Sequence, residues 1–165
     1  MNPQSPDDAP DFDLRAYLLG SWTVDRTMLE KSTGTRGTFT GVVRFTPTAD
    51  GGLRLREEGT VAWAPVPDGP AGTPFTGPAS REYLLRPTDG APATMDMFFP
   101  DGRPFHRMGF GPQSSQDRHW CDPDTYRVRY TRTGADEFRY QWDVTGPAKD
   151  QLLSSVLRRS TEPAA

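Results

Sequence analysis

The sequence predicts an all-β fold: a single antiparallel, up-and-down barrel of about ten strands, with a short helix at its N-terminal end. Apolar and polar side chains alternate with a period of two over most of the 165 residues, which is typical of half-buried strands. Turn-forming residues interrupt this alternation at short intervals. Only 34% of the residues are hydrophobic, which favours a barrel with a partly polar interior over a sandwich of two apolar sheet faces.

Each strand is placed by its alternation and by the turns on either side of it. In chain order, the strands are expected at residues 21–30, 38–45, 53–63, 81–87, 94–99, 103–110, 116–121, 126–132, 138–144 and 151–159. The helical turn is expected at residues 13–19, before the first strand. Residues 65–78 are rich in Pro and Gly and are expected to form a long loop. Closure of such a meander removes its exposed edges.

Length, charge and cysteine content bound the classes of function. We expect one domain over residues 13–160, with disordered tails at residues 1–12 and 161–165. The net charge is −3 and the arginines are scattered, so no nucleic-acid partner is expected. No membrane partner is expected either, because no apolar run approaches the roughly 20 residues of a membrane span. The single cysteine, Cys121, forms no internal disulfide, and the cytoplasm of a bacterium is the predicted location.

One short motif indicates which end of the barrel is closed. Gly20-Ser21-Trp22 follows the expected helical turn and opens the first strand, and a basic residue stands near the end of the last strand. In these two features the chain resembles the intracellular calycins, which are lipocalin-like barrels. The resemblance implies that this arginine lies across Trp22 and closes one end, in a cation–π contact of about 0.5–2 kcal/mol. Alternation does not decide between Arg158 and Arg159, and Arg159 is taken as the closing residue.

Longer segments carry a second resemblance. Together with Gly20-Ser21-Trp22 they are residues 101–106, 119–126 and 142–150. In these segments the chain resembles a small bacterial family of unknown function, over residues 14–160. This second resemblance implies a family but no activity. The calycin resemblance implies a lumen, because intracellular calycins include fatty-acid-binding proteins and haem-binding barrels.

Two opposite charges are expected inside the barrel. Arg26 shares the strand face of Trp22, and Glu57 lies on the apolar face of its own strand, so both point inward if Trp22 does. A buried charge needs a partner. Either Arg26 and Glu57 neutralise each other or lie near an open rim of the barrel, or Arg26 anchors an anionic or carbonyl-bearing ligand.

Further aromatic and basic residues are expected to line the lumen. Arg81 and Tyr83 share one strand face, and Tyr140 and Trp142 share another. Such a lining is mostly apolar with a few polar groups, as small-molecule sites are. The predicted function is therefore binding of a small, largely apolar molecule that carries a carboxylate or carbonyl. The predicted ligand contacts are Arg26, Glu57, Arg81, Tyr83, Tyr140 and Trp142.

The two histidines carry the alternative functions. His106 and His119, together with Tyr126, would supply acid–base groups to a cofactor-independent cyclase or isomerase. A haem barrel with one axial histidine is a further alternative, although no cofactor is predicted. The spacing of His119, Cys121 and Asp124 matches no known zinc signature, so no metal is predicted.

Overall fold

The computed structural model describes residues 12–65, 74–111, 117–121 and 124–160, with the backbone alone at residues 117–121 and 124. In this part of the chain a short helix, α1 (Leu14–Leu18), precedes one ten-stranded antiparallel sheet. The strands are β1 (Gly20–Glu30), β2 (Thr35–Pro47), β3 (Leu53–Trp63), β4 (Phe75–Thr88), β5 (Ala91–Phe98), β6 (Pro104–Gly109), β7 (Asp117–Cys121), β8 (Asp124–Gly134), β9 (Glu137–Thr145) and β10 (Asp150–Arg159). Apart from Phe12, the predicted tails lie outside the described residues.

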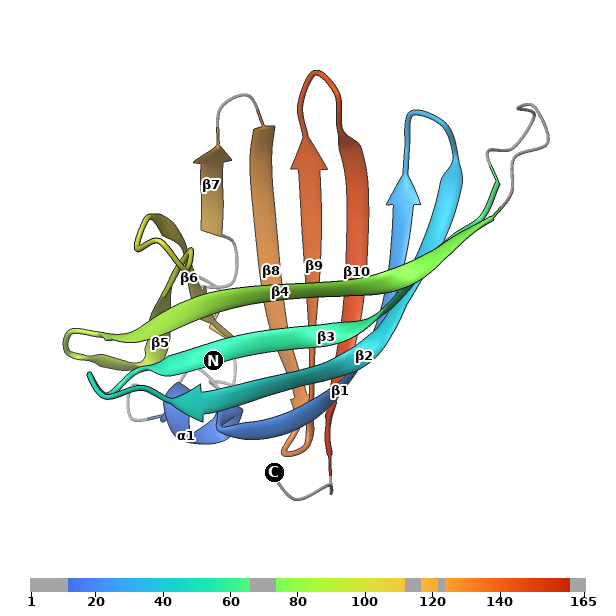
Figure 1. Ribbon diagram of the computed structural model, residues 1–165. Helices are drawn as coiled ribbons and strands as arrows, with labels where there is room; N and C mark the ends of the chain where they lie inside the picture. Colours follow the sequence, from blue (N-terminus) through green and yellow to red (C-terminus); the bar gives the residue numbers. More distant parts are fainter. Residues whose placement is uncertain (1–11, 66–73, 112–116, 122–123, 161–165) are drawn as a thin grey trace, which may run out of the picture.

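The sheet closes on itself almost completely. Its strand order is β6-β5-β4-β3-β2-β1-β10-β9-β8-β7, so the first strand pairs with the last. The two ends of this order, β6 and β7, lie close to each other. In Figure 1, β2–β4 cross in front of β8–β10, so the two halves of the sheet face each other across an interior. The predicted up-and-down barrel with an N-terminal helix is confirmed.

Strand β4 begins earlier than the sequence predicts. The predicted loop at residues 65–78 is wrong at its end, because β4 starts at Phe75 and pairs with β3 from there. The described ladder between β4 and β5 covers only residues 84–98, so the first part of β4 has one partner strand among the described residues. Pro78 lies in that part, where a missing N–H is tolerated at a sheet edge. Residues 66–73 of the predicted loop lie outside the described residues.

The helix covers one end of the barrel. Asp13 caps α1 by accepting a hydrogen bond from the backbone N–H of Ala16 at 3.0 Å. Leu14 and Leu18 are fully buried, and the Tyr17 hydroxyl donates to a backbone carbonyl in the β8–β9 connection at 2.8 Å. No helix among the described residues is long and apolar enough to cross a membrane.

Trp22 and Arg159 complete this closed end. The indole N–H of Trp22 donates to the Leu18 carbonyl at 2.8 Å, and the Arg159 guanidinium carbon lies 4.3 Å from the centre of the indole ring. Arg159 also donates to the Tyr17 carbonyl at 2.9 Å. The structure thus places Arg159 over Trp22, whereas Arg158 is exposed and pairs with acidic residues at the surface.

Strand β1 alternates as its sequence predicts. Trp22, Val24 and Arg26 are buried, and the residues between them are exposed. Trp22 therefore points inward, and Arg26 points inward with it.

A pair of glycines allows β2 and β3 to approach closely. Gly41 and Gly59 are register partners in this ladder. A Cβ atom at Gly59 would stand 2.2 Å from the Thr40 carbonyl oxygen and 2.7 Å from Cζ of Phe39. Only a residue without a side chain fits this position, so the coiling of the two strands and the place of the Phe39 ring both depend on it.

Replacing this glycine should destabilise the barrel. We expect Gly59→Ala to lower the free energy of unfolding by about 1–3 kcal/mol, because its methyl group overlaps the Thr40 carbonyl and Phe39. Gly134→Ala is the matched control, because the space around Gly134 is open, and it should change stability by less than about 0.5 kcal/mol. Urea unfolding followed by circular dichroism measures both. Equal midpoints for Gly59→Ala and the wild type would contradict this constraint.

Candidate functional site

A buried ion pair crosses the interior of the barrel. Arg26 of β1 donates from Nη1 and Nη2 to the two carboxylate oxygens of Glu57 of β3, at 2.8 and 2.7 Å. Its Nε donates to the Ser155 hydroxyl of β10 at 2.7 Å, and its guanidinium carbon lies 5.0 Å from the ring centre of Phe39. The side chains of Arg26 and Glu57 are each only 4% exposed. The two-point geometry offsets part of the cost of taking both charges out of water.

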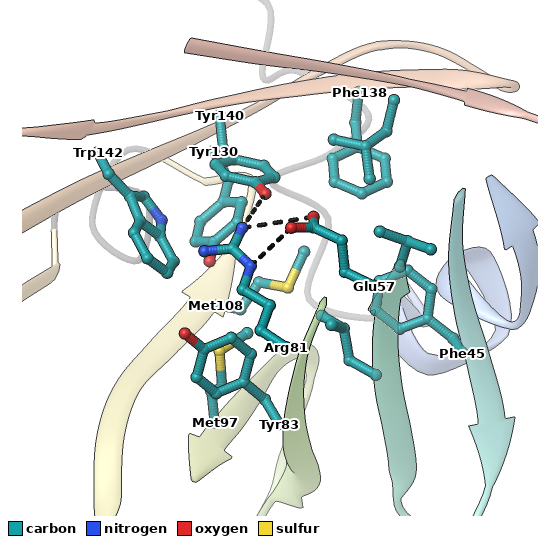
Figure 2. A pocket seen from close by; sticks show the side chains of 13 residues that line it. Phe45, Glu57, Arg81, Tyr83, Met97, Met108, Tyr130, Phe138, Tyr140 and Trp142 are labelled. Atoms are coloured by element: carbon teal, nitrogen blue, oxygen red, sulfur yellow. Dashed lines mark hydrogen bonds and ion pairs between the residues drawn. The ribbon is translucent and has the colours of Figure 1, made fainter. Parts of the chain in front are cut away.

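Arg81 of β4 shares the same carboxylate. Its Nε lies 2.9 Å from Oε1 of Glu57, and its Nη2 donates to the Tyr140 hydroxyl at 2.8 Å. Figure 2 shows the guanidinium between these two groups, and it stacks on Trp142 with 4.6 Å to the ring centre. The Arg81 side chain is 23% exposed, so it is the more accessible of the two arginines. We call Arg26, Glu57, Arg81, Tyr140 and Ser155 the Arg–Glu network.

Tyr140 contacts both arginines, as Glu57 does. Its hydroxyl oxygen accepts hydrogen bonds from Nη2 of Arg26 and from Nη2 of Arg81. Since a hydroxyl oxygen has two acceptor positions, both are used, and the proton of Tyr140 is left to be donated elsewhere.

The charge state of Glu57 follows from its surroundings. Burial by itself would raise the pKa of Glu57, but the hydrogen bond from Arg26 and the charges of Arg81 and Arg26 outweigh burial, and the pKa lies below its ordinary value of 4.5. Glu57 is therefore ionised at neutral pH. Because its pKa is lower in the folded than in the unfolded state, the network adds stability above pH 4.5. That contribution is lost as the pH falls through the folded-state pKa.

An enclosed cavity adjoins the network. The space open to the centre of a water molecule is about 20 Å³, which is room for about one water. Its lining includes Glu57, Arg81, Tyr83, Tyr130, Tyr140 and Trp142, with apolar side chains around them. Burial raises the pKa of Tyr83 and of Tyr130, so both hydroxyls stay protonated at neutral pH.

Half-buried apolar side chains lie on the same strand faces as the network. Met28, Val61, Ala79 and Leu153 stand two or four residues from network members along their own strands, so they point to the same side of the sheet. All four pack against the core and are partly exposed to solvent. We call these four side chains the open apolar face.

The structure brings the predicted ligand contacts together. They lie in the Arg–Glu network or beside it in the cavity lining: Arg26, Glu57, Arg81, Tyr83, Tyr140 and Trp142. Of the two interpretations of Arg26, the structure has the ion pair with Glu57. Sequence reasoning missed Ser155, although its polar side chain stands on an otherwise apolar strand face between Leu153 and Leu157. That break in the alternation was the signal that could have found it.

The residues predicted for acid–base chemistry are placed differently. His106 of β6 is buried, and its Nε2 lies 2.7 Å from the Tyr130 hydroxyl. Phe105 beside it is also buried, because the β5–β6 ladder shifts register there. Tyr126 packs its ring 5.8 Å from that of Phe105 and 6.3 Å from that of Trp142. Coordination of a haem iron through Nε2 of His106 would break its bond to Tyr130.

The remaining predicted residues fall in or next to β7. The side chains of His119, Cys121 and Asp124 lie outside the described residues, so their predicted roles stay predictions. Among the residues that are described, no group of three or more His, Cys, Asp or Glu side chains is arranged to hold a metal ion.

Comparison with known families identifies the family of this chain. The model of a family described as "Family of unknown function (DUF6314)" matches residues 18–159. The chain belongs to this family. None of the curated proteins matches it. The predicted membership of an uncharacterised family is thereby confirmed, and DUF6314 brings no activity with it.

One solved structure supports the fold. The S-type phycobiliprotein lyase CPES from Guillardia theta has a TM-score of 0.64 at 10% sequence identity, over 98% of this chain and 100% of the lyase. At this identity the likeness concerns the fold, a calycin-like barrel. A DUF3598-family protein of unknown function from Nostoc punctiforme is more distant, with a TM-score of 0.45 at 7% identity over 88% of this chain and 48% of its own. A de novo designed fluorescence-activating β-barrel has a TM-score of 0.44 at 14% identity, over 90% and 99% of the two chains.

Removing the shared carboxylate should destabilise the DUF6314 barrel. We expect Glu57→Gln to lower the free energy of unfolding at neutral pH by about 3–5 kcal/mol, because two guanidinium groups then lose their buried carboxylate. Glu58→Gln is the control, because Glu58 is 47% exposed and pairs with Arg56 at the surface, and it should cost less than about 1 kcal/mol. Urea unfolding measures both variants.

The same variant tests the pH dependence. Between neutral pH and about pH 3, wild-type stability should fall more than that of Glu57→Gln, because only the wild type must protonate this carboxylate. Parallel losses of stability in the two proteins would show that Glu57 does not carry the predicted dependence.

Proposed function

We propose that the barrel binds a small, largely apolar molecule in its lumen. The observation that carries this proposal is the junction between the open apolar face and the Arg–Glu network. There a partly exposed arginine, Arg81, stands beside half-buried apolar side chains. A mostly apolar lining with a few well-placed polar groups is the usual composition of a small-molecule site.

In this proposal the ligand rests above the network. Its apolar body covers Met28, Val61, Ala79 and Leu153, which gain from losing contact with water. The cavity, at about 20 Å³, admits about one water-sized group, so the body of a ligand cannot lie there without repacking.

Repacking is within reach of the side chains around the cavity. Met97 and Met108 are part of its lining, and methionine adapts to irregular space more readily than branched side chains do. Because Leu157 of this lining pairs with Val24, on the α1 side of the network, a ligand group entering from the open apolar face would have to move Arg81 as well as these two residues.

The polar residues have distinct proposed roles. Arg81 contacts a polar group of the ligand, and Tyr83 and Trp142 present hydroxyl and ring surfaces next to it. Arg26, Glu57 and Tyr140 hold Arg81 in place and keep its charge at the lumen. The proposed partner is a small molecule, and the proposed location is the cytoplasm, since one cysteine forms no internal disulfide.

An acid–base enzyme is a second candidate, favoured by the hydrogen bond between His106 and Tyr130. Tyr130 lines the cavity, so this pair stands where a proton could pass to a group that enters it. Native mass spectrometry of freshly purified protein would show a retained small molecule, and incubating that molecule with fresh protein separates the candidates: a binding protein returns it unchanged, and an enzyme returns an isomer or cyclised product.

Filling the open apolar face should reduce binding. Nile red, a neutral apolar dye, should bind the purified protein saturably with a blue shift of its emission. Ala79→Phe should weaken this binding about tenfold, because the added ring occupies the surface on which the dye lies. Ser80→Phe is the control, because Ser80 is exposed on the opposite strand face. Fluorescence titration measures both, with unfolding curves to check that both variants fold.

Two outcomes would contradict the proposal. One is an absence of saturable Nile red binding to the wild type. The other is an unchanged affinity in folded Ala79→Phe.

A further inference from the structure

The Arg–Glu network carries more positive than negative charge. Arg26 and Arg81 share the carboxylate of Glu57, which is the one buried carboxylate among the described residues. Both Nη atoms of Arg26 contact this carboxylate at 2.7–2.8 Å, whereas Arg81 has one short contact, from Nε at 2.9 Å, and a longer one from Nη2 at 3.4 Å. Two cations therefore share one anion, and of the two it is Arg81, 23% exposed against 4% for Arg26, that a ligand can reach.

Hydrogen-bond donors surround the same point. The indole N–H of Trp142 is buried near the Tyr130 hydroxyl without a fully formed hydrogen bond to it or to another described residue, and Trp142 as a whole is only 6% exposed. In Figure 2 this nitrogen lies on the edge of the indole that faces the cavity. The Tyr140 hydroxyl uses both acceptor positions on the two arginines and has its proton left to donate.

A partly exposed surplus of positive charge, next to buried donors, favours an acceptor that is itself negative. Hydrogen bonds with an ionised partner are shorter and about twice as strong as neutral ones. A neutral group would satisfy the donors but leave the charge of Arg81 without a counter-ion.

We propose that the lumen selects organic anions, namely amphipathic molecules in which one carboxylate binds Arg81 and the apolar body covers the open apolar face. This inference rests on the proposed lumen binding and names the chemical class of its ligand. The carboxylate binds beside Trp142 and Tyr140, whose N–H and O–H donors complete its shell. Neutralising the surplus charge gives the anion an affinity that a neutral molecule of the same shape lacks.

Stacking offers the competing account of the surplus charge. Arg81 lies over Trp142 at 4.6 Å and near Tyr83 at 5.7 Å, and such contacts stabilise a cation without any ligand. If stacking is the whole compensation, charged and neutral ligands of equal shape bind equally well.

A matched pair of fluorescent probes tests the inference. 1-Pyrenebutanoic acid and 1-pyrenebutanol share an apolar body and differ in charge at neutral pH. In low salt, the acid should bind the wild-type protein at least about tenfold more tightly than the alcohol. Arg81→Gln should bring this ratio close to one, and Arg81→Lys, which keeps the charge, should retain part of the preference.

Two further variants sharpen the result. Arg56→Gln is the matched control, because Arg56 is an exposed arginine that pairs with Glu58 and Glu82 at the surface, and the ratio should not change. Trp142→Phe keeps an aromatic ring but removes the indole N–H. It should therefore weaken binding of the pyrene acid more than binding of the alcohol.

The outcomes separate this inference from the proposed function. Equal binding of acid and alcohol to the wild type overturns the inference and leaves lumen binding intact. A preference for the acid that survives in Arg81→Gln overturns the assignment to Arg81. If neither pyrene probe nor Nile red binds, both the inference and the proposed function fail. If Arg81→Gln does not fold, the ratio of acid to alcohol affinity in the wild type, and its change in Trp142→Phe, still test the preference for anions.

Discussion

Glu57 occupies a position in the barrel where an unpaired carboxylate would be strongly unfavourable. It is 4% exposed and joins β3 to β1 through Arg26 and to β4 through Arg81. Tyr140 and Ser155 extend the connection to β9 and β10, which belong to the other half of the barrel in Figure 1. The network therefore links the two halves of the sheet across the interior, as the hydrogen bond between His106 of β6 and Tyr130 of β8 also does. Three charged groups pay a desolvation cost here, and only their mutual geometry offsets it.

This polar layer divides the interior into two parts with different properties. Toward α1, Trp22 and Arg159 close the end of the barrel over a core of fully buried side chains. On the other side, apolar side chains of the same strands are partly exposed. Stability comes mainly from the first part, because the area removed from water is greatest there. The chemistry available to a ligand lies at the boundary, where Arg81 is both charged and accessible.

The fold alone leaves the function of a DUF6314 protein open. Barrels of this shape serve unrelated purposes, so function has to be argued from the chemistry of the site. In this chain the proposed site and the network share residues: Glu57 pairs with Arg26 across the interior and also contacts Arg81. We therefore expect stability and ligand binding to respond together to changes in the network, and separately to changes on the open apolar face.

The sequence by itself determined the fold class and the inward faces of the strands, because alternation with a period of two is a local property. It placed Trp22 and Arg26 on one inward face and Arg81 and Tyr83 on another, as the structure has them. Tertiary structure decided which inward residues meet. Whether Arg26 reaches Glu57 depends on how far β2, which separates their strands, coils at its glycines, and no local pattern encodes that distance.

Two other features lay beyond the sequence for related reasons. The register shift between β5 and β6 turns both Phe105 and His106 inward, which strict alternation forbids. The early start of β4 at Phe75 depends on a partner strand, β3, that supplies a ladder in spite of Pro78. Alternation specifies the side of a sheet to which a residue points. The register and curvature of neighbouring strands decide which other side chains that residue contacts. Register and curvature are in turn set by packing across the whole barrel.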